Sequence, residues 1–425
     1  MKSIRPDHKI QIRHLKSFVL PILFFAEIAA SASPNPTPTP TPAPPAIPPV
    51  LAEIDRHVRD EFWDPKWKGV DWTASVRLAA AALAAARDDA ERDAVYDRLL
   101  AQLDDSHTFR LGAGKLPSRN WGTAGLRIGQ ESDGYAVKGV LPGSAAEQVG
   151  IRLGDRILAV GTKAYGKERV NFRDLFLVFQ GPVGSSVDVT WKPAGSASIR
   201  TTSIARTLEE SGDALVWRSA RVIRRGGRAY GYVRFWGLSS ETALALVDLL
   251  QDRQESSRVK PELSGFKDID GLLVDVRGNS GGYDPGIIAT YLKGRWISGS
   301  FLLRSRGGSS VAPPPYDPLP TALLVNSGTA SAGESLALQF RRHAIGPIVG
   351  ETTAGMASGG AFPDSLSDHS TLWISRRALE DFDGSSFEGR GVAPDVAVSD
   401  LPPARDGEEE AIVEAGIRAL AGGKR

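Results

Sequence analysis

Apolar residues at helical spacing fill the chain from residue 50 to about residue 103. In 50–62 they recur every three or four positions, the segment after Asp71 is rich in alanine, and 91–103 carries its valine and leucines on one face. Such periodicity is typical of amphipathic helices that bury one side. We therefore predict a small helical unit over residues 50–117.

From about Gly122 the pattern changes to short β-rich runs separated by glycine turns. The predicted strands are 125–129, 135–140, 154–160 and 187–191. A short helix is expected after Pro142-Gly143, and residues 154–160 read Gly-Asp-Arg-Ile-Leu-Ala-Val. In these two features the segment 118–207 resembles a PDZ domain.

The resemblance to a PDZ domain implies a peptide-binding edge. A PDZ domain adds an extended peptide to an exposed strand, and backbone N–H groups hold the terminal carboxylate of the peptide. The peptide-binding loop and strand would be Gly125, Leu126, Arg127 and Ile128. The alternative is a PDZ-shaped spacer that binds no peptide.

After Arg228, apolar strands alternate with helical segments. The predicted strands are 229–235, 271–276 and 322–325, and the predicted helices are 240–254, 285–292 and 408–421. Buried strands joined by helices indicate a largely parallel sheet with helical cover. The expected fold class is therefore multidomain α/β, in which residues 208–425 form an α/β domain behind the helical and β-rich units.

The first 49 residues are typical of a targeting segment and a spacer. Five basic residues precede an apolar run at 18–25, and small residues up to Ala32 follow it. This layout predicts a signal peptide over 1–32, because the run is shorter than the ~20 apolar residues that cross a bilayer. Residues 33–49 are almost wholly Pro, Thr, Ala and Ser, which predicts a stiff linker. We expect an exported protein, periplasmic or extracellular; an uncleaved membrane anchor is the alternative.

Composition narrows the chemistry that is available to the chain. The 51 basic and 50 acidic residues leave a net charge of +1, which does not favour nucleic acid as a partner. With no cysteine, disulfides, thiolate metal sites and a cysteine nucleophile are excluded. The histidines beyond the targeting segment, His57, His107, His343 and His369, lack the i, i+4 pairing of a helical zinc site. We predict no cofactor and no protein-bound metal.

Two motifs are suited to a nucleophile and an oxyanion hole. Ser331 lies where the strand 322–325 leads into a helix, so its hydroxyl would face the N–H groups of the first helical turn. Residues 275–282, Asp-Val-Arg-Gly-Asn-Ser-Gly-Gly, run from a strand into a glycine-rich turn whose backbone can approach a ligand closely. Read alone, Ser331 also fits a helix cap, and the turn fits a tight connection without a ligand.

Two further motifs carry groups suited to proton transfer. The pair Ser106-His107 closes the helical unit, and Glu388 precedes the Gly-Val-Ala-Pro-Asp run at 391–395. A neutral histidine accepts protons near neutral pH, and a carboxylate can orient and polarise it. Read alone, His107 is by default an ordinary surface or core histidine, and Glu388 is a solvated carboxylate.

Together the four motifs resemble the tail-specific, or carboxyl-terminal processing, serine protease family in its tricorn-type Ser-His-Ser-Glu branch. The resemblance implies an α/β catalytic domain of the crotonase-like, tail-specific protease type and an endopeptidase that hydrolyses polypeptides. It implies that Ser331 is the nucleophile and His107 the base, and that Ser106 and Glu388 complete the tetrad. It also implies that the N–H groups of Gly282 and Ala332 form the oxyanion hole.

One departure distinguishes the branches of that family. The bacterial processing proteases carry a lysine base in a Gly-Glu-x-x-x-Gly-Lys run, whereas this chain has Met356 at the lysine position. Methionine cannot accept a proton, so the resemblance makes His107 the base. The alternatives are a non-catalytic ligand- or peptide-binding protein on the same fold, and a PDZ adaptor whose last domain is only a scaffold.

Overall fold

The structure is a computed structural model that describes residues 47–117, 120–250, 266, 268–283, 285–294, 318–360, 362–380, 384–399 and 410–422. All of them belong to the unit that begins at Pro45. The predicted signal peptide and nearly all of the predicted linker lie outside the described residues. Within the described ranges, no helix is both long and apolar enough to cross a bilayer.

Three helices follow the linker, as the apolar periodicity predicts. They are α1 (Pro49–Glu61), α2 (Trp72–Ala85) and α3 (Asp89–Ala101), with a 3-10 turn at Trp67–Gly69 between the first two. The side chain of Asp71 caps α2 by accepting from Ala74 N at 3.0 Å, and Asp88 caps α3 by accepting from Glu91 N at 2.8 Å.

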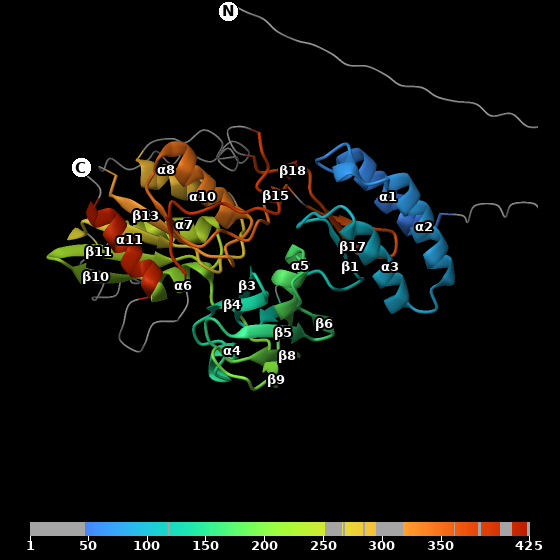
Figure 1. The fold of residues 1–425 in the computed structure, drawn as a ribbon, viewed down its shortest axis with the longest axis horizontal. Coiled ribbons are helices and arrows are strands. Elements are labelled where there is room, and N and C mark those ends of the chain that lie inside the picture. The colour runs from blue at the N-terminus through green and yellow to red at the C-terminus, as the bar shows by residue number, and fades with distance from the viewer. Residues whose placement is uncertain are drawn as a thin grey trace, which may run out of the picture. The chain divides into compact units, whose positions relative to one another are not determined.

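The helical unit is completed by a segment from the far end of the chain. Strand β1 (Phe109–Leu111) pairs with β17 (Thr371–Ile374), which pairs with β16 (Phe362–Ser365), both antiparallel. The apolar side chains of Leu366, Leu372 and Ile374 join the core between the three helices. Figure 1 shows β17 beside β1 and next to the blue helices.

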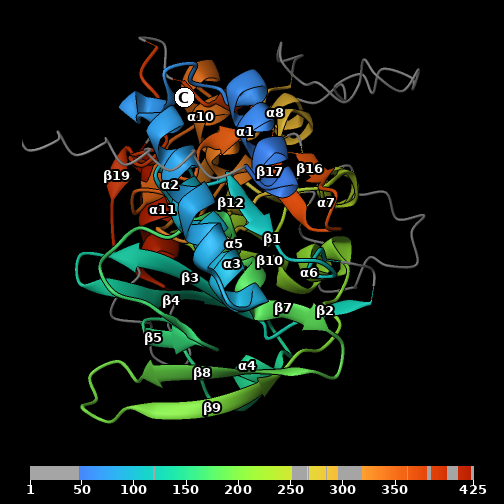
Figure 2. The same ribbon diagram turned by 90° about the vertical axis from the view of Figure 1, so that its right-hand side faces the viewer.

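The middle of the chain forms an antiparallel sheet in the order β3-β4-β5-β8-β9, with β6 paired to β5 (Figure 2). The strands are β3 (Leu126–Glu131), β4 (Gly134–Val140), β5 (Arg156–Val160), β6 (Lys163–Ala164), β8 (Ser186–Lys192) and β9 (Arg200–Ala205). The short helices are α4 (Ala145–Gln148) and α5 (Phe172–Leu175), followed by a 3-10 turn at Leu177–Phe179. Strands β2 (Trp121–Thr123) and β7 (Gln180–Pro182) form a separate pair. We call residues 120–207 the β-rich unit.

The last part of the chain contains a six-stranded sheet in the order β10-β11-β12-β13-β14-β19. Its strands are β10 (Arg221–Arg225), β11 (Arg228–Arg234), β12 (Gly271–Asp275), β13 (Thr321–Val325), β14 (Ile348–Gly350) and β19 (Val396–Ala397). All neighbouring pairs are parallel except β10 with β11. A separate small ladder joins β15 (Ser358–Gly359) to β18 (Arg377–Ala378).

Helices cover both faces of the six-stranded sheet, which is why its strands are apolar on both sides. Leu272 and Val274 of β12 face α7 (Ser240–Leu250), α8 (Gly286–Lys293) and α10 (Ala332–His343), with α6 (Gly212–Ser219) in the same core. Leu273, between them, faces α11 (Ala411–Gly422) on the opposite side (Figure 1). The predicted mixed α/β, multidomain character is confirmed.

Candidate active site

Ser331 lies at the turn between β13 and α10, at the carboxyl-terminal edge of the parallel sheet. Its backbone has φ = 53°, a left-handed value that residues other than glycine rarely adopt. Such strain persists only where the surroundings enforce it, and it is common where a side chain has to be presented to a ligand. The sequence predicted this strand-to-helix location.

The glycine-rich turn after β12 runs directly against Ser331. Gly281 and Gly282 have φ values of +91° and +134°. A Cβ added to Gly281 would lie 3.0 Å from Ser331 Oγ and 3.2 Å from Ala332 N, so only glycine fits there. The backbone of this turn and the first N–H group of α10 therefore lie on either side of the serine hydroxyl, an arrangement suited to stabilising an oxyanion.

The buried carboxyl group of Glu334, in the first turn of α10, holds this turn in place. It accepts from Ser331 N at 3.1 Å, Thr353 Oγ1 at 2.6 Å, Gly355 N at 2.8 Å and Met356 N at 2.8 Å. Burial raises the pKa of Glu334 to about 7, against hydrogen bonds that favour the ionised form. Glu334 thus ties the Ser331 turn to the loop 353–356.

His107, Ser106 and Glu388 form a continuous hydrogen-bonded chain. Ser106 Oγ lies 2.9 Å from His107 Nδ1 and donates to Glu388 Oε2 at 3.0 Å, while Ser106 N donates to Glu388 Oε1 at 2.8 Å. The same carboxylate accepts from the backbone N–H groups of Ala357 and Ser358 at 2.8 Å and 2.6 Å. Residues 282 positions apart in the sequence are therefore brought together.

Two residues of the β-rich unit contact this row of hydrogen-bonded side chains, and the sequence motifs did not predict either of them. Arg169 forms a short ion pair with Glu388 and donates to Gly355 O at 2.7 Å. The ring of Phe172 stacks on the His107 imidazole with centroids 4.8 Å apart, and Phe172 N donates to Ser106 O at 2.8 Å. Their positions follow from long-range packing, which a single sequence does not reveal.

Electrostatics set the protonation states that base catalysis needs. Burial would raise the pKa of the Glu388 carboxyl, but Arg169 and the backbone donors lower it below its ordinary value. Burial lowers the pKa of His107, against the raising effect of Asp105 and Glu388. At neutral pH the carboxylate is therefore charged and the imidazole neutral.

The Ser331 turn and the cluster around His107 meet at the loop 356–358. Ser331 N donates to Met356 O at 3.2 Å, and the next residue, Ala357, donates to Glu388. Among the described residues no hydrogen bond joins Ser331 to His107 directly. Met356, at the position of the family's lysine, is buried in the apolar core of the β-rich unit, where it packs with Ala330.

The predicted peptide-binding residues lie at the edge of the β-rich sheet that faces the loop before α10. Strand β3 is the terminal strand, and a Cβ on Gly129 would lie 2.6 Å from Ser327 O. The buried guanidinium of Arg127 pairs with Glu209 at 3.2 Å, so its carboxylate partner is internal. Gly125 packs against Ser144, with φ = +86°.

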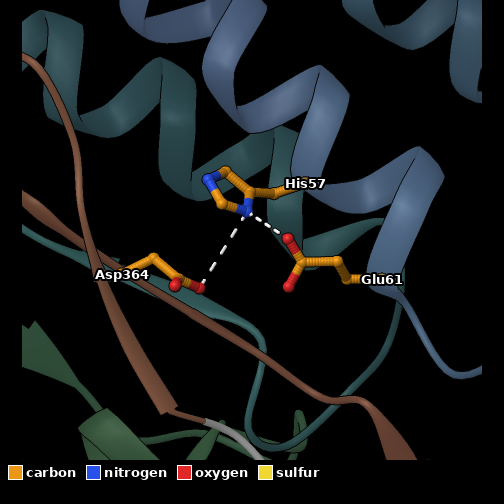
Figure 3. Close-up of side chains that lie close together, drawn as sticks. All are labelled: His57, Glu61 and Asp364. Atoms are coloured by element: carbon orange, nitrogen blue, oxygen red, sulfur yellow. Dashed lines mark hydrogen bonds and ion pairs between the residues drawn. The ribbon is translucent and has the colours of Figure 1, made fainter.

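A further cluster of potential metal ligands lies between α1 and β16, and the sequence did not indicate it. His57 Nδ1 lies 2.6 Å from Glu61 Oε1 and 3.9 Å from Asp364 Oδ2, as Figure 3 shows. Arg376 donates to both carboxylates, to Asp364 at 2.7 Å, and therefore already supplies the positive charge. We describe this cluster as an ion-pair network that joins α1 to the C-terminal strands.

Comparison with known proteins agrees with the class that this fold and site define. The family model described as peptidase family S41 matches residues 229–398. A C-terminal processing peptidase, chloroplastic, from Tetradesmus obliquus is 32% identical over 334 residues, which is 72% of this chain and 68% of that protein. The chain belongs to peptidase family S41 and is by family a serine-type peptidase.

Three other similar proteins support this assignment. Tricorn protease homolog 1 of Streptomyces coelicolor is 27% identical over 376 residues, covering 82% of this chain. The chain spans 33% of that protein and 30% of a second tricorn homologue from the same organism. A solved photosystem II D1 C-terminal processing protease superposes with a TM-score of 0.57 at 24% identity, over 82% of this chain and 92% of that one, which is a likeness of fold.

Proposed function

We propose that this chain is an endopeptidase that hydrolyses polypeptides with a Ser331–His107–Ser106–Glu388 tetrad. The observation that carries the proposal is the hydrogen-bonded chain from the His107 imidazole through Ser106 to the buried Glu388 carboxylate, close to the strained Ser331 turn. A buried imidazole backed by a hydroxyl and a carboxylate is suited to general base catalysis. Family membership supports the same reading.

The mechanism follows from the roles that this geometry permits. Nδ1 of His107 faces Ser106, so Nε2 is left to take the proton of the Ser331 hydroxyl as the oxygen attacks the scissile carbonyl. The charge that develops on the carbonyl oxygen is stabilised by N–H groups of Gly282 and Ala332. His107 then gives its proton to the leaving amine, and water releases the acyl group from Ser331.

Closing of the site is part of this proposal, because Ser331 and His107 share no hydrogen bond in the described structure. Catalytic hydrogen bonds are often long or poorly aligned before the substrate binds, and they tighten in the complex. Ser331 and His107 are carried by separate elements that meet at the loop 356–358, which is therefore the segment through which their approach would be coupled.

We further infer that residues 118–207 form a PDZ-like domain that captures exposed or C-terminal segments of substrates. The antiparallel sheet with a terminal strand β3 and the helix α5 beside it supports this reading. The domain boundaries would be 50–117, 118–207 and 208–425, after a signal peptide and linker, in an exported protein. Gly125, Leu126, Arg127 and Ile128 would line the groove.

The proposal is tested by active-site labelling of the purified protein together with casein degradation. We expect a fluorophosphonate to label wild type and casein to be degraded, and Ser331→Ala to lose both. Ser327→Ala is the matched control, because Ser327 lies in the same loop before α10, and it should be labelled normally. Absence of labelling in folded wild type would favour a non-catalytic ligand- or peptide-binding protein.

A further inference from the structure

A second carboxylate, Asp105, lies behind His107, and the proposed tetrad makes no use of it. Asp105 Oδ1 accepts from His107 N at 3.1 Å, Thr108 Oγ1 at 2.8 Å and Ser375 Oγ at 2.5 Å, while Oδ2 accepts from Trp63 Nε1 at 2.9 Å. The side chain is 6% exposed. A buried charge is costly to retain unless it is well bonded, and these donors meet that need.

Ser358 links this carboxylate to the imidazole. Its hydroxyl lies 3.4 Å from His107 Nδ1, 3.0 Å from Ser106 Oγ and 3.2 Å from Asp105 Oδ1. All of these groups are buried, so water does not compete for the bonds. The imidazole nitrogen thus faces two serine hydroxyls, and each hydroxyl is in contact with its own carboxylate.

We propose that Ser358 and Asp105 form a second hydroxyl–carboxylate arm on His107, parallel to Ser106 and Glu388, which positions the imidazole and partly replaces the first arm when that arm is lost. The inference rests on the proposed function, since it assumes that His107 is the base. The Ser106 arm is the shorter one and dominates in wild type. Ser358 and Asp105 are positioning residues, because they act through the imidazole.

The arrangement has an electrostatic consequence. When His107 takes the Ser331 proton it becomes an imidazolium, and a hydroxyl that donates to a carboxylate can accept from Nδ1–H. The charged groups that face the imidazole are Asp105 on its own segment, Glu388 on the loop before β19 and Arg169 from the β-rich unit. Two carboxylates oppose one guanidinium, so each arm stabilises the charged base.

The structural alternative is that Asp105 only orders its own turn. Its bonds to His107 N and Thr108 Oγ1 form a local turn of the kind that aspartate commonly stabilises. In that case Ser358 would have no effect on the base beyond packing. Ser370 is the matched control for this test, because it is a buried serine of the same C-terminal segment that bonds to Arg110 and Asp368 and, among the described residues, shares no hydrogen bond with Asp105, Ser358 or the imidazole.

A double-mutant cycle on the full chain tests the proposal, with the rate of fluorophosphonate labelling and kcat on casein as readouts. We expect Ser106→Ala to lower the rate ~10-fold and Ser358→Ala ~3-fold, and the double variant to lose at least ~100-fold, more than the product, because coupled groups are non-additive. The control pair Ser106→Ala with Ser370→Ala should give the product of its single effects, because Ser370 lies outside this hydrogen-bond network.

The pH dependence gives a second readout that a merely structural role would not move. Ser358→Ala should shift the rising limb of the pH–rate profile to lower pH, because the imidazolium loses one arm, whereas Ser358→Thr retains a hydroxyl and should restore the limb. Ser370→Ala should leave the limb in place. If circular dichroism shows that the double variant does not fold, the position of the rising limb in Ser358→Ala alone tests the second arm.

The outcomes separate this inference from the proposed function. Suppose that the rate loss of the double variant equals the product of the single losses, that Ser358→Ala leaves the rising limb in place, and that Ser331→Ala is inactive. The second arm would then be overturned while the proposed function stands. If wild type is not labelled at all, or if His107→Ala retains the full labelling rate, the proposed function itself fails. Synergistic loss together with the shifted limb supports both.

Discussion

The turn that carries Ser331 and the cluster that carries His107 are built in different ways. The Ser331 turn is held mostly by neighbours in the chain and in the same domain: Gly281, Glu334 and the loop 353–356. The His107 cluster draws on the end of the helical unit, on Arg169 and Phe172 of the β-rich unit, and on Glu388. The first is built chiefly within one part of the chain, apart from the packing of Ala330 and Met356 in the core of the β-rich unit. The second draws on all parts of the described chain.

This difference means that the two halves should respond differently to mutation. A change in the Ser331 turn removes chemistry and leaves the packing of the units intact. A change in the His107 cluster alters contacts between units, so it affects the orientation and the pKa of the base together. The comparison therefore predicts that changes in the Ser331 turn abolish activity without altering stability. Changes in the His107 cluster should instead lower activity by degrees and in a pH-dependent way.

The largest expected effect is that of Ser331→Ala. We expect kcat to fall by on the order of 10⁶-fold, the scale that accompanies loss of the nucleophile in a serine protease. Thermal unfolding should change little, since an N-cap serine contributes only about 1 kcal/mol. Substantial residual hydrolysis in the pure variant would show that another group attacks the substrate.

Arg169→Met should have the next largest effect, because it removes the ion pair that fixes Glu388. We expect kcat to fall about 10²-fold, the size of effect that misplaced catalytic groups produce. Arg173→Met is the matched control: Arg173 lies in the same unit and pairs with Asp97 and Asp174 without contacting the tetrad. Equal losses of kcat in the two variants would mean that Arg169 acts only through the packing of the β-rich unit and not through its ion pair with Glu388.

Met356→Lys should lower stability and give no gain in rate. The side chain lies in an apolar cluster with Ala330, where burial disfavours the charged form of an ammonium group. Thermal unfolding and peptide hydrolysis, measured beside the volume-conserving Met356→Leu, check this. A marked rate gain in the lysine variant would identify the chain as a Ser-Lys enzyme that has lost its base.

The smallest effect is a shift of the pH–rate profile, and its sign is informative. Because burial lowers the pKa of His107, the rising limb of kcat/KM should lie below the ordinary histidine value of about 6.5. Glu388→Gln should move the limb further down and Arg169→Met should move it up, since the carboxylate raises and the guanidinium lowers the pKa of His107. Shifts of the same sign in both variants would contradict the assigned electrostatics.

Much of the fold was predictable because its signals are local. The periodic helices near residue 50, the apolar strand around Leu272 to Val274 and the turn at Ser331 all lie within one or two residues of the predicted positions. Even the two-sided burial of β12 follows from its unbroken apolar run. In each case the determining residues are neighbours in the sequence.

The rest depends on contacts that the sequence does not encode locally. The pairing of β1 with β17 and the insertion of Leu372 into the helical core join segments more than 250 positions apart. Arg169 belongs to a stretch with no recognisable motif, and only the fold brings it to Glu388. Burial also affects the pKa of His107: the sequence predicted only a base that works near neutral pH, whereas burial in the folded chain lowers this pKa.

The contacts of Arg169 and Phe172 have a consequence for how this protein can evolve and be engineered. Because the β-rich unit contributes an ion pair to Glu388 and a stacking partner to His107, it cannot be exchanged independently of these two residues. Exchanging residues 120–207 for the same unit of a relative would transfer substrate preference only if the incoming unit brought an equivalent guanidinium and aromatic ring. Recombination within this lineage is therefore expected to preserve these two positions before it preserves any residue of the peptide-binding groove.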